Sequence, residues 1–453
     1  MPDMSSLRWP PVCVDTRRTL GGGRAPRAVW TTTIGRSTAR VPASPPAADP
    51  EETALMTVDL RNSVVRAVAA ADDGPGFFVV ADGRLCLTVG QGAEAEVVCE
   101  LPNIREEREG GYWRDSPLAL QLYVHGPWVC VTERFGENAT LVNTVTGLVR
   151  ELSRKLRHHS FTSYSVGFVE RGGRTLLIAQ TDFNRLDIFD AETGDLRTDR
   201  EMYSRRVGEP NEDGVWEVEE KNWSWLAAST LHVAPGSAHF LCEASSTMHS
   251  AECVYSVNDF LEDWGASVAH LEGCGDSAIR PLTFIDDSTF VVAVDDLLLG
   301  GFMDQEDAVE EGYEYKQLHF FTIPSPLTPD GEARWLDPVA KVDCEVFPLD
   351  DDGGVKGELH HDKATGLLVA LSADGAFLVR LDGSVVEHLP GLSPPFGVFD
   401  DGKGEGWRYA KDRRLFYRWR DGVGIEERTF SWAGADDGTR PPAQSATAAD
   451  ERS

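Results

Sequence analysis

Short apolar runs of about four to eight residues, bounded by Gly, Asp, Asn or Pro, follow one another between residues 57 and 430. Examples are FFVV (77–80), WVCVT (128–132), TFVVAV (289–294) and LLVAL (367–371). Alternation with a period of two and enrichment in β-branched and aromatic residues predict strands. The best helical stripe is the short segment 257–264, VNDFLEDW. We therefore expect an all-β fold.

The expected strands recur in groups that end in a tight hairpin. In 174–201 the strand RLDIFD leads into a turn in which Gly194 is free to take a positive φ. The preceding unit, 127–152, has the same shape with Gly147 in its turn. About seven outgoing strands of this kind recur at steps of roughly 40–75 residues, the longer steps in the middle. This spacing predicts a β-propeller of about seven four-stranded blades, two of them enlarged by insertions.

The hairpin segments also carry a family resemblance. LDIFDAETGDL (186–196) resembles the closing hairpin of a WD-repeat blade, with Phe189 and Asp190 where that family places Trp and Asp. LVNTVTGLV (141–149) is similar in the same frame, with Asn143 in place of the Trp. The Gly-His and Trp-Asp dipeptides of WD repeats are absent from the sequence.

The resemblance is therefore to the β-propeller superfamily at large, including its WD-repeat, YVTN-type and quinoprotein-like branches. Through CVYSVNDFLED (253–263) the chain also looks similar to uncharacterised bacterial propeller proteins. The resemblance implies the fold of residues 56–432 and no specific function.

Closure of the sheets into a ring would leave no exposed apolar face at either end of the series. The last expected blade has only three strand segments, GWRYA, RRLFYRW and IEERTF. The strand-like stretch 56–71, MTVDLRNSVVRAVAAA, precedes the first full blade, and we expect it to complete the last one.

The two ends of the chain differ from the region between them. Residues 1–48 contain seven Arg and only two acids, with no apolar periodicity. Three interpretations of the extension 1–55 stay open: a disordered tail, translation from a start upstream of a true start at Met56, and an organelle transit peptide. The polar tail 433–453 is expected to be disordered.

Charge and cysteine content narrow the class of protein. The formal net charge of −31 disfavours nucleic acid and anionic membranes as partners, and no apolar run is long enough to span a bilayer. The eight cysteines form no CxxC pair, which favours buried thiols and a cytoplasmic location.

The sequence has no GxSxG, Walker or HExxH motif, and we expect no cofactor. Two histidine pairs occur, His158–His159 and His360–His361. Neighbouring residues on a strand face opposite sides, so neither pair readily gives two ligands to one metal. A metal site that combines one histidine with Asp362 or Glu358 in the central channel stays open.

Two acidic runs, 209–220 and 301–314, have six acids each and no base. They are either solvated loops or a docking surface for a basic partner, and they lack the ordered spacing of a calcium loop. The candidate binding residues in them are Asp213, Glu217, Asp304, Glu306, Asp307 and Glu310.

One segment, WRYAKDRRLFYRWR (407–420), is basic, whereas the chain as a whole is strongly acidic. Its alternation predicts a half-buried strand whose arginines cover apolar surface and pair with acids. The other interpretation is a docking surface for an anionic protein partner. The candidate binding residues here are Arg413, Arg414, Arg418 and Trp419.

The function hypothesis is a non-catalytic, monomeric scaffold that docks protein partners through blade loops. The alternative is an enzyme or small-ligand binder that uses the central channel, with or without a divalent metal. The absence of catalytic motifs favours the scaffold over the enzyme.

Overall fold

The computed structural model describes most of the chain between residues 56 and 429, and the expected tails 1–55 and 433–453 lie outside the described residues. The described ranges are 56–89, 94–104, 120–154, 163–182, 184–199, 203–207, 217–221, 227–245, 250–262, 268–271, 280–294, 316–327, 334–347, 357–394 and 406–429.

The chain divides into two units. The smaller unit includes Ser204–Glu219, where β13 (Tyr203–Val207) and β14 (Glu217–Lys221) form a two-stranded sheet. The larger unit, Leu55–Tyr203 with Glu220–Ser453, contains all the other described strands.

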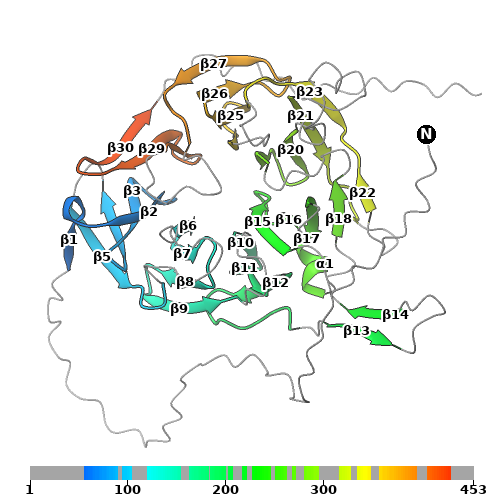
Figure 1. Ribbon diagram of the computed structural model, residues 1–453, viewed down its shortest axis with the longest axis horizontal. Helices are drawn as coiled ribbons and strands as arrows, with labels where there is room; N and C mark the ends of the chain where they lie inside the picture. Colours follow the sequence, from blue (N-terminus) through cyan, green and yellow to red (C-terminus); the bar gives the residue numbers. More distant parts are fainter. Residues whose placement is uncertain are drawn as a thin grey trace, which may run out of the picture. The chain divides into compact units, whose positions relative to one another are not determined.

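Seven sheets, antiparallel except for one pair of strands in the fourth, follow one another around a ring in the larger unit (Figure 1). We number them as blades 1 to 7 in chain order. Blade 1 contains β1 (Thr57–Asp59), β2 (Val65–Ala70), β3 (Gly76–Ala81), β4 (Arg84–Val89) and β5 (Glu94–Glu100). Blade 2 contains β6 (Leu120–His125), β7 (Trp128–Glu133), β8 (Asn138–Asn143) and β9 (Leu148–Ser153). Blade 3 contains β10 (Val166–Arg171), β11 (Arg174–Asp182) and β12 (Arg185–Asp190).

The remaining blades continue the series. Blade 4 contains β15 (Ala227–Val233), β16 (His239–Ser245), β17 (Ser250–Ser256), β18 (Val268–Leu271) and β22 (Arg334–Leu336). Blade 5 contains β19 (Leu282–Phe284), β20 (Thr289–Val294), β21 (Gln317–Thr322) and β23 (Ala340–Asp343). Blade 6 contains β24 (Glu358–Asp362), β25 (Leu367–Ser372), β26 (Gly375–Val379) and β27 (Val385–Pro390). Blade 7 contains β28 (Arg408–Ala410), β29 (Leu415–Arg420) and β30 (Gly424–Thr429).

This unit is a seven-bladed β-propeller, as the strand pattern predicts. Helix is nearly absent from the described residues: η2 (Leu60–Asn62) is a single 3₁₀ turn, and α1 (Val257–Glu262) lies where the helical stripe predicts it. No helix among the described residues is long and apolar enough to cross a membrane.

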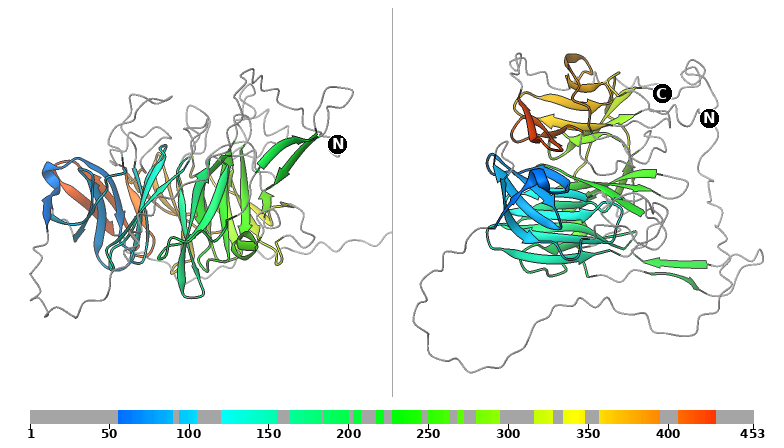
Figure 2. Two further views of the ribbon diagram at one scale, coloured as in Figure 1. Left: turned by 90° about the horizontal axis from the view of Figure 1, so that it is seen from below. Right: turned by 60° about the vertical axis from the view of Figure 1, so that its left-hand side comes forward.

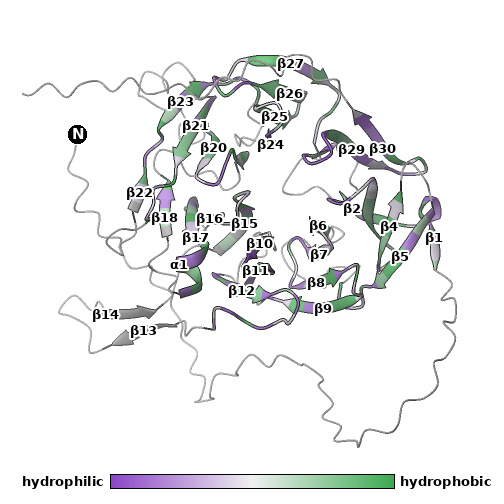
Figure 3. Ribbon diagram, turned by 180° about the vertical axis from the view of Figure 1, so that it is seen from behind, coloured by the Kyte–Doolittle hydropathy of each residue, from purple (hydrophilic) through white to green (hydrophobic). Residues whose placement is uncertain are grey.

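Each sheet is apolar on both faces because it lies between two others. All six residues of β3 are buried, and successive side chains point to opposite faces. Phe77 and Val79 therefore pack in the cluster shared with blade 7, whereas Phe78 and Val80 pack in the cluster shared with blade 2. Seven such clusters fill the seven interfaces between successive blades. In Figure 3 green, hydrophobic positions run along β8 and β26, whereas the charged β30 is purple.

The ring closes by side-chain packing between blade 7 and blade 1. Tyr417 and Trp419 of β29 share one buried cluster with Phe77 of β3, and the Phe77 and Tyr417 rings are 5.3 Å apart. The expectation that residues 56–71 complete the last blade is wrong. In that stretch β1 pairs with β5 and β2 pairs with β3, so both strands belong to blade 1.

A local turn explains this pairing. The Asp59 carboxylate accepts a hydrogen bond from the Arg61 backbone N–H at 3.1 Å and so caps η2. Leu60, fully buried in the cluster between blades 7 and 1, anchors the turn. The chain thus turns at Leu60–Asn62 from β1, at the outer edge of blade 1, to β2, the innermost strand of the same blade.

Seen from the side, the strands of the blades run between two faces of the ring (Figure 2). We call the face at which the innermost strands β2, β6, β10, β15, β19, β24 and β28 begin the upper face, and the other the lower face. The passages between successive blades, such as β5 to β6, join strand ends at the upper face. In addition, β21 leaves blade 5 at the lower face for β22, which pairs in parallel with β18 of blade 4 before the chain returns to blade 5 as β23. The lower face carries the hairpins after the innermost strands, such as 126–127 and 172–173, and the closing turns of the blades.

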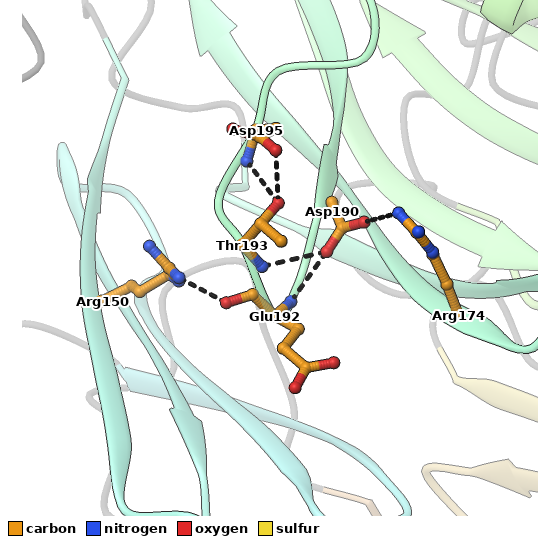
Figure 4. Close-up of polar contacts among 6 residues, drawn as sticks. All are labelled: Arg150, Arg174, Asp190, Glu192, Thr193 and Asp195. Carbon is orange, nitrogen blue, oxygen red and sulfur yellow. Dashed lines mark hydrogen bonds and ion pairs between the residues drawn. The ribbon is translucent and has the colours of Figure 1, made fainter.

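The closing turn of blade 3, at the lower face, is stabilised by side-chain hydrogen bonds (Figure 4). Asp190 accepts hydrogen bonds from the backbone N–H groups of Glu192 and Thr193, and pairs with Arg174 at 3.2 Å. Arg150, on the outermost strand of blade 2, donates to the Glu192 carbonyl oxygen. The acid that the WD-repeat resemblance singles out is therefore a turn-capping residue.

Gly147 and Gly194 offer a matched test of these turns, since their φ angles are +71° and +77°. Alanine in the left-handed region costs about 1 kcal/mol at each site. At Gly194 a Cβ would also lie 2.5 Å from Arg150 Nη1, whereas nothing lies within 4 Å at Gly147. Gly194→Ala is expected to lower the free energy of unfolding by about 1 kcal/mol more than Gly147→Ala, the worth of one hydrogen bond. Equal losses in urea unfolding would show that Arg150 does not brace the turn.

Candidate functional site

Most of the acidic candidate residues lie outside the described part of the chain. These are Asp213, Asp304, Glu306, Asp307 and Glu310. Glu217 is the first residue of β14, and its side chain is not among those described. Their predicted role in docking stays a prediction.

The basic candidates are described, and Arg413 joins two blades. It lies in the hairpin between β28 and β29, where Nη1 donates to the Gly76 carbonyl oxygen at 2.9 Å. Its guanidinium carbon is 4.4 Å from the ring centroid of Phe77, and Nη2 is 3.5 Å from Glu427. This arginine therefore covers the closure between blade 7 and blade 1.

The other three basic-segment candidates also make contacts within the protein. Arg414 pairs with Asp362 of blade 6 at 2.9 Å. Arg418 faces Glu426 across β29 and β30 and pairs with it at 2.6 Å. Trp419 is only 2% exposed and packs in the closure cluster. The structure thus matches the interpretation of 407–420 as a half-buried strand with paired arginines.

The histidine pair of β24 separates as strand geometry predicts. The His360 ring lies 5.5 Å from that of Tyr409 in blade 7. His361 faces the other neighbour, where burial lowers its pKa and a hydrogen bond with the backbone of Ile285 in blade 5 opposes that shift. His158 and His159 lie outside the described residues.

His360 belongs to a polar group, which we call the channel cluster, formed by Arg134, Glu358, His360 and Arg408. Glu358 begins the innermost strand of blade 6 and Arg408 that of blade 7. Glu358 Oε2 and His360 Nε2 are 3.1 Å apart. Arg134 comes from the turn after β7 in blade 2, and its guanidinium carbon lies 5.0 Å from the Phe135 ring centroid.

The blade numbers place this cluster in the channel. Both Arg134 and Arg408 interact electrostatically with Glu358. Blade 2 and blade 6 are separated around the ring by blades 7 and 1, so an interaction between Arg134 and Glu358 has to cross the lumen. Since Glu358 and Arg408 begin innermost strands, the crossing lies at the upper face.

The electrostatics fix the charge of Glu358. Burial is the strongest influence and acts to raise the pKa of this carboxyl. The hydrogen bond with His360 and the charges of Arg408 and Arg134 outweigh it, so the pKa lies below its ordinary value. Glu358 is an ionised carboxylate at neutral pH, facing two guanidinium groups.

The cluster is also reachable from solvent. The side chains of His360 and Glu358 are 26% and 32% exposed, although desolvation dominates the environment of the carboxyl. The channel cluster is therefore the candidate functional site of the described structure.

A second polar group lies in the interface between blades 4 and 5. Glu243 and Glu252 are directly opposite each other on β16 and β17 and are almost fully buried. Arg280, which precedes β19, lies 3.7 Å from Glu252, and His232 lies 3.6 Å from Glu243. Burial and the facing Glu243 carboxylate raise the pKa of Glu252, and Arg280 opposes that rise.

No group of three or more metal-ligating His, Cys, Asp or Glu side chains occurs among the described residues. Glu358 and His360 are two such groups, but Asp362 is engaged by Arg414 and by Thr365. The described channel therefore offers arginine and carboxylate chemistry.

No protein-family model matches the sequence, and no curated protein matches it either. The expected closeness to uncharacterised bacterial propeller proteins thus has no support from sequence families.

Several solved structures are similar to the chain. The Dos1 propeller has 12% identity and a TM-score of 0.45, with 81% of this chain and 78% of that chain covered. Hydrazine synthase from Kuenenia stuttgartiensis has 9% identity and a TM-score of 0.46, with 85% of this chain and 99% of that chain covered. A catalytically inactive virginiamycin B lyase from Staphylococcus aureus with quinupristin has 11% identity and a TM-score of 0.44, covering 83% and 99%.

Arg413→Ala tests whether this arginine serves the ring closure. Losing its hydrogen bond and its contact with Phe77 is expected to cost about 1–3 kcal/mol of unfolding free energy. Arg420→Ala is the control, because that side chain is 57% exposed and its pairing with Glu426 is worth less than about 1 kcal/mol. Similar urea midpoints for the two variants would show that Arg413 does not stabilise the contact between blade 7 and blade 1.

Glu252 predicts a pH dependence of stability. Burial raises its pKa from 4.5 to about 7, with Arg280 opposing and Glu243 reinforcing the rise. The folded state then holds a proton that the unfolded state has lost, so stability falls as pH rises from about 5 to about 7. The shift corresponds to about 3 kcal/mol, which Glu252→Gln is expected to abolish.

The measurement is the free energy of unfolding at pH 5 and pH 8 for wild type and variant. Glu426→Gln is the control, because hydrogen bonds from Arg420 and Arg418 lower the pKa of Glu426 and leave no slope in this window. A wild-type slope that persists in Glu252→Gln would contradict the assignment.

Proposed function

We propose that the protein is a non-catalytic interaction scaffold that docks a basic protein partner at the upper face of its propeller. The observation that supports this most is the position of the acidic run 301–314, which joins β20 to β21. The end of β20 and the start of β21 lie at the upper face.

The charges favour a partner of basic chemistry. The chain carries a net charge of −31, and the two acidic runs contain no base. Complementary charge raises the rate at which two proteins associate and makes the choice of partner specific. The arginines that an acidic partner would need, Arg413, Arg414 and Arg418, are paired within the propeller.

The proposal places the protein in the cytoplasm as a monomer. The six described cysteines are free, and five of them are buried. Burial raises the pKa of Cys130 well above that of an ordinary thiol, which makes it unreactive. Free, buried thiols suit a reducing compartment.

The test is capture of the partner by variants of the full chain. Wild type and the triple variant Asp304→Asn, Glu306→Gln and Asp307→Asn are used as tagged baits at physiological salt. We expect the variant to retain less than about a tenth of the partner, since losing several charge pairs weakens binding by at least 1.4 kcal/mol. A second variant, Asp213→Asn with Glu217→Gln, tests the other acidic run.

The control neutralises three exposed acids on outer strands: Glu94→Gln, Glu96→Gln and Glu151→Gln. It removes the same charge and is expected to retain the partner. Equal capture by all baits would contradict docking through the acidic runs. An equal loss of partner in the control would show that the effect comes from the net charge of the chain and not from these runs.

A further inference from the structure

Four polar side chains from two blades meet in the contact between blades 4 and 5. His232 lies on β15, the innermost strand of blade 4, with Glu243 on β16 and Glu252 on β17. Arg280 comes from blade 5, just before β19. We call these four residues the interface cluster.

The two carboxylates point into this contact. Glu243 and Glu252 are register partners on neighbouring strands, so they project from the same face of blade 4. Leu241 and Val254, two residues away along the same strands, share that face. Both pack in the apolar cluster that also contains Leu282 of blade 5. The interface cluster is therefore a polar group within a contact that is mainly apolar.

The distances within the interface cluster are too long for hydrogen bonds. Arg280 Nε lies 3.7 Å from Glu252 Oε1, and His232 Nε2 lies 3.6 Å from Glu243 Oε1. An N–H···O hydrogen bond is about 2.7–3.2 Å long. The ion pairs therefore leave hydrogen-bonding capacity unused on both blades.

The atoms left over are buried donors and acceptors. Arg280 Nε and Nη1, Glu243 Oε2 and His232 Nε2 have no hydrogen-bond partner among the described residues. The side chains of Arg280 and Glu243 are only 1% and 3% exposed, so bulk solvent does not satisfy them. Buried polar atoms are almost always bonded to protein or to ordered water.

The missing partner has to accept hydrogen bonds from a guanidinium and donate them to a carboxylate. We propose that the interface cluster is a buried water-binding site, in which water is held between Arg280 of blade 5 and Glu243 of blade 4. This goes beyond the docking of a basic partner and does not depend on it, because it assigns a ligand to the contact between two blades.

Charged ligands fit the interface cluster less well. An anion would face two carboxylates, and a metal ion would face the Arg280 guanidinium. No group of three or more metal-ligating side chains occurs in the part of the chain that the structure describes. Water is uncharged and typically makes about three hydrogen bonds to polar groups in a buried site.

His232 connects the site with solvent. Its side chain is 27% exposed, against 5% or less for the other three members of the interface cluster. The bound water is therefore expected to exchange with bulk solvent past this side chain, and more slowly than water on the open surface.

The first experiment is a high-resolution crystal structure of the full chain, which needs no variant. We expect an ordered water within about 3.2 Å of both Glu243 Oε2 and one nitrogen of Arg280. If the Arg280 guanidinium and the Glu243 carboxylate share no ordered water, the proposal is wrong.

Oxygen-17 relaxation dispersion tests the site in solution, because it detects water that exchanges slowly with bulk. Glu243→Met removes the acceptor and leaves Arg280 opposite Glu252, so the buried charges stay balanced. This variant is expected to lose about one slowly exchanging water per chain. Glu243→Gln keeps an oxygen acceptor at the same position and is expected to retain it.

The control is Asp187→Asn in blade 3. Asp187 is also a buried carboxylate on a central strand, but its oxygens accept hydrogen bonds from Arg185 and Thr198. We expect this variant to hold as much slowly exchanging water as wild type. An unchanged signal in Glu243→Met, or an equal loss in Asp187→Asn, would overturn the proposal.

Discussion

The structure depends on apolar packing between neighbouring blades. Each sheet buries both of its faces, as β3 does with Phe77 on one side and Phe78 on the other. A sheet of this kind has no stable position outside the ring, because an unpartnered apolar face costs about 25 cal/mol for each square ångström left in water. The closure between blade 7 and blade 1 is the seventh such contact, and without it both end blades would expose a hydrophobic face.

Closure also creates the candidate site. Arg134, Glu358 and Arg408 come from blades 2, 6 and 7, and only the complete ring brings them together. Side-chain packing rather than a shared strand joins the described ends, so Arg413 and Leu60 at the seam affect the geometry of the channel. The closure contact therefore matters both for the fold and for the geometry of the channel cluster.

The strands could be predicted because burial on both faces leaves short, bounded apolar runs such as TFVVAV in β20. The pairing partner of each strand could not be predicted. The period-two alternation in 56–71 would be the same whether these strands paired in blade 1 or in blade 7. The cap at Asp59 and the buried Leu60 decide between them. The sequence placed Glu358 beside His360 because residues two apart share a face of a strand. Nothing in the sequence indicates that Arg134 and Arg408 both lie near Glu358, since this depends on contacts between residues far apart in the chain.

Hydrogen exchange with mass spectrometry tests the closed ring most directly. If blade 7 packs on blade 1 as described, amides of β29 and β3 open only in global unfolding and show the same protection as those of β16 or β25. If β28, β29 and β30 exchange orders of magnitude faster than the other blades, the ring is open at this seam. The channel cluster would then lack one of its arginines.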